Sequence, residues 1–300
     1  MDRKEKSKEW VVYINGDYLP ESEAKISVFD HGVLHGDGVF DALFAWGGYV
    51  FKLDEHIDRF FRSIHACKYD MPLSKEELKN VVLKVVRTNR EKNQYIKCLV
   101  TRGVGPLPLL TPIGCKTTVI VFSKPYEWKI DPNKIGSGIK ARIVSIRRIP
   151  PQCLDPKVKN LNYLNFVLAR REAFGSGADE AIMLDIYGFV GECPGSNLFI
   201  VKGKKLYTPP PEHILVGITR ETIFEIAERE GLPVVEQQMT TSDLYNADEV
   251  LFTSTAGGIT PVVDIDGRKI SNGTVGPITM RMFKLYFRML EEGYHGTPFL

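Results

Sequence analysis

Hydrophobic positions follow two different spacings in the first half of the chain. Residues 11–14 alternate and run into the turn Asn15-Gly16-Asp17, which predicts a β-hairpin. Apolar residues at helical spacing predict a helix over residues 53–67. Ser74 followed by Glu77 is a capping-box pattern and predicts a second helix from there to residue 86. Runs rich in β-formers predict further strands at residues 33–46, 49–51, 95–102 and 117–122.

The pattern breaks near residues 123–132, where proline and charge cluster, and then resumes. Helices are expected at 161–174, 219–230 and 277–292, and strands at 138–145, 181–184, 189–190, 198–201 and 250–253. We therefore expect a smaller α+β domain over residues 1–123, a linker over 124–137 and a larger domain over 138–300. The predicted fold class is mixed, α+β with α/β, in two domains.

Composition narrows the class of protein. Hydrophobic residues make up 43% and charged residues 25% of the 300, and the net charge of +2 gives no reason to expect a nucleic acid or an anionic membrane as a partner. The chain has no apolar run of about 20 residues, and the first residues are a polar tail without a signal-peptide core. The five cysteines form no Cys-x-x-Cys pair, so we expect no metal site, no disulfide framework and a cytoplasmic location.

One pair of segments carries candidate chemistry. Lys159 stands four residues before Tyr163, and Glu192 precedes a glycine-containing turn. A pyridoxal phosphate pocket needs a lysine that forms a Schiff base and an acid that keeps the pyridine nitrogen protonated. By itself the first segment also fits two solvated charges, Lys157 and Lys159, ahead of a helix.

A phosphate cradle is expected elsewhere in the chain. Gly217 leads directly into the helix expected at 219, so the amides of Ile218 and Thr219 point toward an anion at a helix N-terminus. An ordinary threonine-capped helix explains the same residues. The small, hydroxyl-rich turn at 253–258 can add donors, or be only a tight loop. Arg59 can add a fork-shaped donor, although a lone helical arginine is more often a surface residue.

Taken together, these motifs resemble the fold-type IV, class IV pyridoxal phosphate enzymes. This group includes branched-chain amino acid aminotransferases, D-amino acid aminotransferases, (R)-selective amine aminotransferases and aminodeoxychorismate lyases. The resemblance spans nearly the whole chain. The motifs that carry it are Asp30-His31-Gly32 with Gly36-Asp37-Gly38-Val39-Phe40, residues 53–59, Lys159-Asn160-Leu161-Asn162-Tyr163, Gly191-Glu192, Asn197-Leu198-Phe199, Gly217-Ile218-Thr219-Arg220, Ala247-Asp248-Glu249-Val250, Ser254-Thr255-Ala256 and Ile259-Thr260-Pro261-Val262.

The resemblance implies specific roles. Lys159 would be the Schiff-base lysine and the proton shuttle, and Glu192 the partner of the pyridine nitrogen. The remaining cofactor contacts would come from Arg59, Tyr163, Asn197, Ile218, Thr219, Ser254 and Thr255. Substrate contacts would come from His35, Phe40, Phe44, Tyr95, Lys97, Thr255 and Ala256. The family unit is a homodimer.

This chain departs from the branched-chain pattern at two positions. The strand motif Phe-Glu-Gly-Ile-Arg reads Phe40-Asp41-Ala42-Leu43-Phe44, and Tyr-x-Arg reads Tyr95-Ile96-Lys97. We expect an aminotransferase that takes a hydrophobic, branched-chain-like donor and a 2-oxo acid acceptor by ping-pong half-reactions. An (R)-amine or D-amino acid aminotransferase, a lyase on the same fold, and a cofactor carrier without turnover are the alternatives. His31 and His35 are expected at a turn and strand start, as pocket or structural residues and not as metal ligands.

Overall fold

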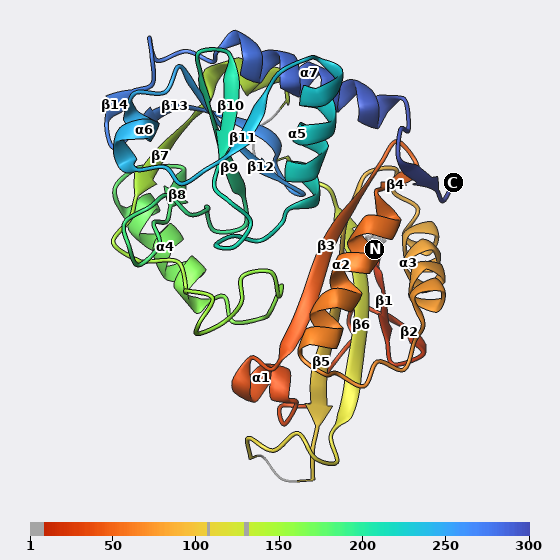
Figure 1. Cartoon of the computed structure of the whole chain (residues 1–300). Helices are drawn as coiled ribbons and strands as arrows, with labels where there is room; N and C mark the ends of the chain where they lie inside the picture. The colour runs from red at the N-terminus through yellow and green to blue at the C-terminus, as the bar shows by residue number, and fades with distance from the viewer. Residues whose placement is uncertain (1–8, 107–108, 129–131) are drawn as a thin grey trace, which may run out of the picture. The chain divides into compact units, whose positions relative to one another are not determined.

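The computed structural model describes residues 9–106, 109–128 and 132–300 (Figure 1). The predicted polar tail at 1–8 and residues 129–131 of the predicted linker lie outside this part of the chain. The chain divides into two compact units. The first comprises Met1–Glu127, Lys159–Asn162 and Gly293–Leu300, and the second comprises Trp128–Val158 and Tyr163–Glu292.

The segment around Lys159 packs with the first unit, although the sequence analysis grouped it with the second domain. The Phe40 amide donates to the Lys159 carbonyl at 2.8 Å, and the Leu161 amide donates to the Gly38 carbonyl at 2.9 Å. These two bonds extend the edge of a strand in the first unit, so the lysine is held by residues more than a hundred positions earlier in the chain.

The first unit is an antiparallel sheet with two helices against it. Helices α2 (Leu53–Ala66) and α3 (Lys75–Asn89) pack against the sheet and against each other (Figure 1). Ser74 and Glu77 form both bonds of the predicted capping box. The strand order is β15-β4-β3-β5-β6-β1-β2. The strands are β1 (Val11–Ile14), β2 (Asp17–Pro20), β3 (Gly38–Trp46), β4 (Tyr49–Phe51), β5 (Gln94–Val104), β6 (Lys116–Pro125) and β15 (Gly296–Pro298).

The strand predicted to begin at residue 33 is wrong at its start. His31–His35 form a short helix, α1, because the Asp30 carboxylate caps the Gly32 amide and Gly36 ends the helix with φ 67°. His31 and His35 therefore lie one turn apart on a helix, and not at a turn and strand start.

The second unit contains a mixed sheet ordered β11-β10-β9-β12-β13-β7-β8, with β14 paired to β13. The pairs β10–β11, β13–β7 and β7–β8 are parallel, and the other pairs are antiparallel. The strands are β7 (Ile139–Ile143), β8 (Glu180–Ile182), β9 (Asn197–Lys202), β10 (Lys205–Thr208), β11 (Val234–Glu236), β12 (Glu249–Ser254), β13 (Gly258–Ile265) and β14 (Arg268–Lys269).

Helices of this unit pack against its sheet and, in one case, against each other. Helix α4 (Leu164–Gly175) contacts β7 and β8, and α5 (Ile218–Arg229) contacts β12 and α7 (Pro277–Glu291) (Figure 1). The remaining helices are α6 (Thr241–Tyr245) and a 3₁₀ turn (Pro132–Ser137). The strand predicted at 189–190 is only an isolated bridge between Leu184 and Val190. In the described part of the chain, no helix is both long enough and apolar enough to cross a membrane.

Candidate active site

The backbone of Lys159 is fixed from two directions within the first unit. Its carbonyl accepts from Phe40 on β3, and its amide donates to the Ser63 hydroxyl on α2 at 3.2 Å. The side chain is half-buried, and its Nζ lies 4.7 Å from the centroid of the Phe40 ring. A half-buried amine on a rigid backbone suits a lysine that must form and break a covalent bond to a cofactor.

A second lysine contacts the same aromatic ring. Lys97 on β5 places its Nζ 4.2 Å from the Phe40 ring centroid. Burial lowers the pKa of Lys97, and the charge of Lys159 lowers it further. Within the described residues, no acidic side chain contributes to this shift. The structure thus brings together Lys159, Lys97 and Phe40, three of the predicted site residues.

The opposite face of β3 carries a buried ion cluster. Asp41 accepts from Arg59 at Nε and Nη2, each at 2.8 Å, and His56 Nδ1 lies 2.7 Å from its Oδ1. Burial favours the neutral acid, but the charge of Arg59 and the hydrogen bonds from Arg59 and His56 outweigh it and hold the pKa of Asp41 far below its ordinary value. Burial lowers the pKa of His56, so this imidazole is neutral near pH 7 and donates to Asp41. Arg59 is 4% exposed, so the surface alternative for this residue is wrong.

Three other predicted substrate residues have defined surroundings in the first unit. Phe44 is 1% exposed and packs at 5.4 Å and 5.3 Å from the rings of Phe51 and Tyr126. Phe44 pairs in register with Tyr95 across β3 and β5. His35 stacks edge-on against His31, and its buried Nε2 has no hydrogen-bond partner among the described residues. Their predicted contact with substrate stays a prediction.

The carboxylate of Glu192 is buried and accepts several hydrogen bonds within the second unit. It is 5% exposed, and its Oε1 accepts from Arg148 Nε at 2.7 Å. Its Oε2 accepts from the Asn197 amide group at 3.2 Å and from the Leu215 backbone amide at 3.1 Å. Three donors fix the orientation of this carboxylate and favour its charged form, as the acid beside a pyridinium nitrogen requires.

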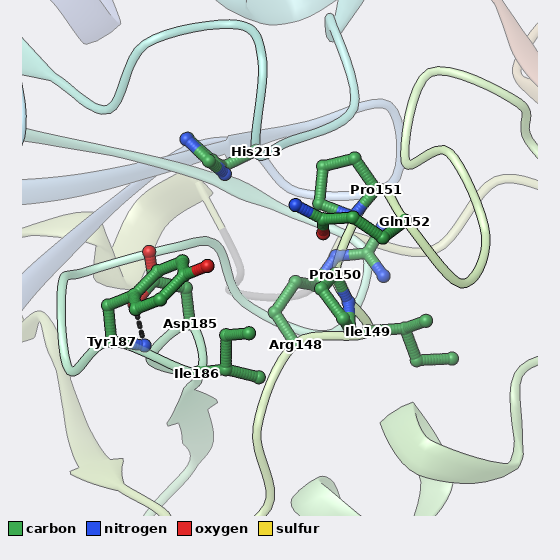
Figure 2. Close-up of a pocket in the computed structure, with 9 residues that line it drawn as sticks. All are labelled: Arg148, Ile149, Pro150, Pro151, Gln152, Asp185, Ile186, Tyr187 and His213. Carbon is green, nitrogen blue, oxygen red and sulfur yellow. Dashed lines mark hydrogen bonds between the residues drawn. The ribbon is translucent and has the colours of Figure 1, made fainter.

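Arg148 is a functional candidate that the sequence analysis did not find. Its guanidinium lies 4.7 Å from the Phe166 ring, which in turn lies 4.8 Å from the ring of Tyr163. Arg148 also lines a small, mainly apolar surface pocket (Figure 2). The other lining residues are Ile149, Pro150, Pro151, Gln152, Asp185, Ile186, Tyr187 and His213. The local signal was an arginine pair, Arg147-Arg148, between two isoleucines, and nothing nearby marks which arginine is buried, because the partner of Arg148 is 44 residues away.

The predicted phosphate cradle begins at Gly217, the N-cap of α5. This cap makes no side-chain hydrogen bond, so the threonine-capped alternative is wrong and α5 begins at Ile218. A Cβ on Gly217 would lie 2.1 Å from Asn197 Oδ1, so only glycine fits between this amide and the helix. The backbone amides of Ile218 and Thr219, in the first turn of this helix, are the donors suited to an anion.

Ser254, a predicted cofactor contact, lies at the turn after β12 and has a structural contact there. The Ser254 hydroxyl accepts from the Gly257 amide at 2.9 Å and so shapes its own turn. Thr253, the residue before it, has a buried hydroxyl with no partner among the described residues. Thr255 and Ala256 follow on the turn itself. No cluster of three or more His, Cys, Asp or Glu side chains in the described residues has the arrangement of a metal site.

Each unit by itself offers groups that suit pyridoxal phosphate. The first unit offers an amine at Lys159. The second offers a fixed carboxylate at Glu192 and a helix start at Gly217, where the close approach of Asn197 excludes any larger side chain. An aldehyde, a pyridine nitrogen and a phosphate are the groups that these donors can hold.

Comparisons with known proteins agree with this assignment. Residues 38–265 match the family model described as "Amino-transferase class IV". The "Putative branched-chain-amino-acid aminotransferase" of Methanocaldococcus jannaschii is 48% identical, over 90% of this chain and 93% of that protein. The D-alanine aminotransferase of Staphylococcus haemolyticus is 37% identical, over 95% and 96%. The branched-chain aminotransferase of the archaeon Thermoproteus uzoniensis, solved with norvaline, superposes with a TM-score of 0.90 at 35% identity, over 97% and 100%.

A further solved structure bears on the cofactor. It is a branched-chain amino acid aminotransferase with pyridoxamine 5'-phosphate, and it superposes with a TM-score of 0.93 at 33% identity. The match covers 98% of this chain and 99% of that one. The likeness therefore extends over both units and includes a protein that holds the aminated form of the cofactor.

Proposed function

The chain belongs to the class IV aminotransferases, and we propose that it moves an amino group from a hydrophobic, branched-chain-like amino acid to a 2-oxo acid. It is a pyridoxal phosphate-dependent enzyme with the fold-type IV architecture. When bound, this cofactor supplies the electron sink that makes the Cα–H bond of an amino acid acidic.

Lys159 carries the proposal. The observation behind this is its half-buried amine on a backbone that Phe40 and Ser63 fix from both sides. We assign to its Nζ the covalent attachment of the cofactor and the transfer of the proton at the substrate Cα. Both half-reactions of a ping-pong cycle use the Lys159 amine. The side chain must therefore return to the same position after each half-reaction.

The other chain residues orient and bind. Glu192, fixed by Arg148 and Asn197, would keep the pyridine nitrogen protonated. The amides of Ile218 and Thr219, the guanidinium of Arg59 and the turn at Ser254 and Thr255 would hold the phosphate. Tyr163 would donate to the ring oxygen.

Substrate preference is proposed from the residues that the family resemblance assigns to the substrate. Phe40, Phe44 and Tyr95 would give an aromatic environment on the side of Lys97. Thr255 and Ala256 would border the substrate carboxylate, and His35 would be a further contact. A D-amino acid donor is the second candidate, favoured by the 37% identity to a D-alanine aminotransferase over nearly the whole of both chains.

The test is a donor panel on purified holoenzyme, following conversion of the bound cofactor to its pyridoxamine form. The panel contains L-leucine, L-glutamate, D-alanine and an (R)-arylalkylamine. We expect fast conversion with L-leucine and none in Lys159→Ala. Lys157→Ala is the matched control, because its side chain is exposed in the same segment. Conversion mainly by D-alanine or the (R)-amine would replace the proposed donor, and an active Lys159→Ala protein would overturn the assignment.

We also propose a homodimer and a cytoplasmic location, each supported by one observation. Val28, Phe29 and Val33 are 68%, 58% and 57% exposed, and a second copy of the chain would cover such apolar residues, which supports a homodimer. All five cysteines are free, which supports the reducing cytoplasm. Light scattering of the holoenzyme tests the first, with a single-chain mass of 33.9 kDa as the contradicting result.

A further inference from the structure

Lys97 and Lys159 are close enough for their charges to act on each other. Their Nζ atoms lie 4.2 Å and 4.7 Å from one ring centroid, that of Phe40. Because both distances end at the same point, the two nitrogens are at most about 9 Å apart, which is within the screening length of about 8–10 Å at ordinary ionic strength. Both side chains are half-buried, so solvent screens this pair less than it would a surface pair.

Among the described residues, the buried acid of β3, the strand that holds the Lys159 carbonyl, is already paired. On β3, the carboxylate of Asp41 is bound by Arg59 and by His56, both from α2. Ser63, also on α2, offers only an uncharged hydroxyl to the Lys159 backbone. On β5, Lys97 is the charged residue that shares the Phe40 ring with it.

We propose that Lys97 acts on Lys159 through its charge, disfavouring a proton on Lys159 Nζ and so keeping that amine reactive near neutral pH. The repulsion is mutual, and burial together with the charge of Lys159 lowers the pKa of Lys97. This inference rests on the proposed attachment of the cofactor to Lys159. In this proposal Lys97 acts even when no substrate is bound. A lysine that only contacts the substrate would have no effect on the substrate-free enzyme.

The experiment is a pH titration of the visible absorbance of the bound cofactor in substrate-free holoenzyme. Lys97→Gln removes the charge, and Lys97→Arg keeps it at the same position. We expect the midpoint of the absorbance change to rise by about one pH unit in Lys97→Gln and to stay near the wild-type value in Lys97→Arg. Lys97→Met, which keeps the apolar stem, replaces Lys97→Gln if that variant does not fold.

The outcomes separate this inference from the proposed function. A wild-type protein that takes up no pyridoxal phosphate chromophore, or a Lys159→Ala protein whose absorbance and titration match the wild type, overturns the function itself. A bound chromophore whose absorbance does not change with pH, in the wild type and in Lys97→Gln alike, overturns the role of Lys97. A normal wild-type titration with an unchanged or lowered midpoint in the neutral variants overturns the role of Lys97 alone. An equal rise in Lys97→Arg would also overturn it, because the effect would then not depend on charge.

Discussion

Asp41 holds the buried guanidinium of Arg59 at two points, through Oδ2 to Nε and through Oδ1 to Nη2. Asp41 is 1% exposed, and both bonds are 2.8 Å long. A bidentate pair fixes the plane of the guanidinium, and His56 fixes the carboxylate in turn. This arrangement fixes the orientation of Arg59, the residue that we propose for the cofactor phosphate.

Asp41→Asn should therefore cost both stability and cofactor affinity. Breaking a buried pair from one side leaves an uncompensated charge, and we expect a loss of about 3–5 kcal/mol in the free energy of unfolding. Asp58→Asn is the control, since Asp58 pairs with Lys75 at exposed positions, where a loss of about 1 kcal/mol or less is expected. Urea denaturation measures the loss of stability in the two variants, and titration with pyridoxal phosphate measures their cofactor affinity. Equal losses of stability in Asp41→Asn and Asp58→Asn would contradict the role of Asp41.

Acid should unfold the wild-type protein through this same cluster. The folded pKa of Asp41 is far below the unfolded value of about 3.9, so its stabilisation is present above pH ~4 and is lost as the pH falls further. Asp37, whose pKa Arg102 and Tyr69 lower against the effect of burial, acts in the same direction. Denaturation midpoints between pH 3 and 7 test this. A profile that is flat below pH 4 would contradict it.

Arg148→Ala should lower the affinity of the protein for pyridoxal phosphate. The change leaves Glu192 buried without its charged partner, so its carboxylate would favour the neutral form and bind a protonated pyridine less well. We expect the dissociation constant for pyridoxal phosphate to rise about tenfold or more, as for other supporting residues of this kind. Arg147→Ala, the exposed neighbour, should leave it unchanged. Spectroscopic titration with pyridoxal phosphate measures the dissociation constants of the two variants. Equal constants in Arg148→Ala and Arg147→Ala would refute the assignment of Arg148 as the residue that supports Glu192.

Gly217→Ala should disturb the proposed phosphate site without straining the backbone. The φ of Gly217 is −76°, which alanine adopts, but the new Cβ would collide with Asn197 Oδ1 at 2.1 Å. We expect a destabilisation of about 1–3 kcal/mol and weaker binding of the cofactor. Gly175→Ala, in open space at the end of α4, is the control and should be neutral or slightly stabilising. Thermal melting and phosphate-dependent cofactor binding measure the difference.

Local signals explain which elements the sequence predicted. The capping box of Ser74 and Glu77 is read from neighbouring residues and lies where expected. The glycine signal places the end of α4 to within one residue, since Gly175 is its last residue and Gly177 follows with φ 80°, but α4 begins at Leu164 and not at residue 161. The strands β10 and β11, of four and three residues, were not predicted, and neither was the eight-residue β13, so strand length alone does not explain the misses. Helix α6 was missed although Thr240 and Asp243 form a capping box, since five residues give too short a period to detect.

From the sequence, only those residues of the candidate site could be predicted that lie in a recognisable local motif. Lys159 and Glu192 stood out by their segments, but Asp41 and Arg148 did not, because their partners lie 18 and 44 residues away. The strand predicted from residue 33 failed for a similar reason. The Asp30 cap that starts α1 competes with β-propensity, and α1 itself packs against the distant strand β5.

The central claim is that Lys159 carries the cofactor, and one measurement tests it most directly. Holoenzyme is reduced with borohydride, which traps any imine between the cofactor and a lysine, and the protein is digested and mapped by mass spectrometry. We predict the pyridoxyl group on Lys159 alone, with Lys97 and Lys157 unmodified. Stoichiometric modification of Lys97 or Lys157, with Lys159 unmodified, would contradict the account.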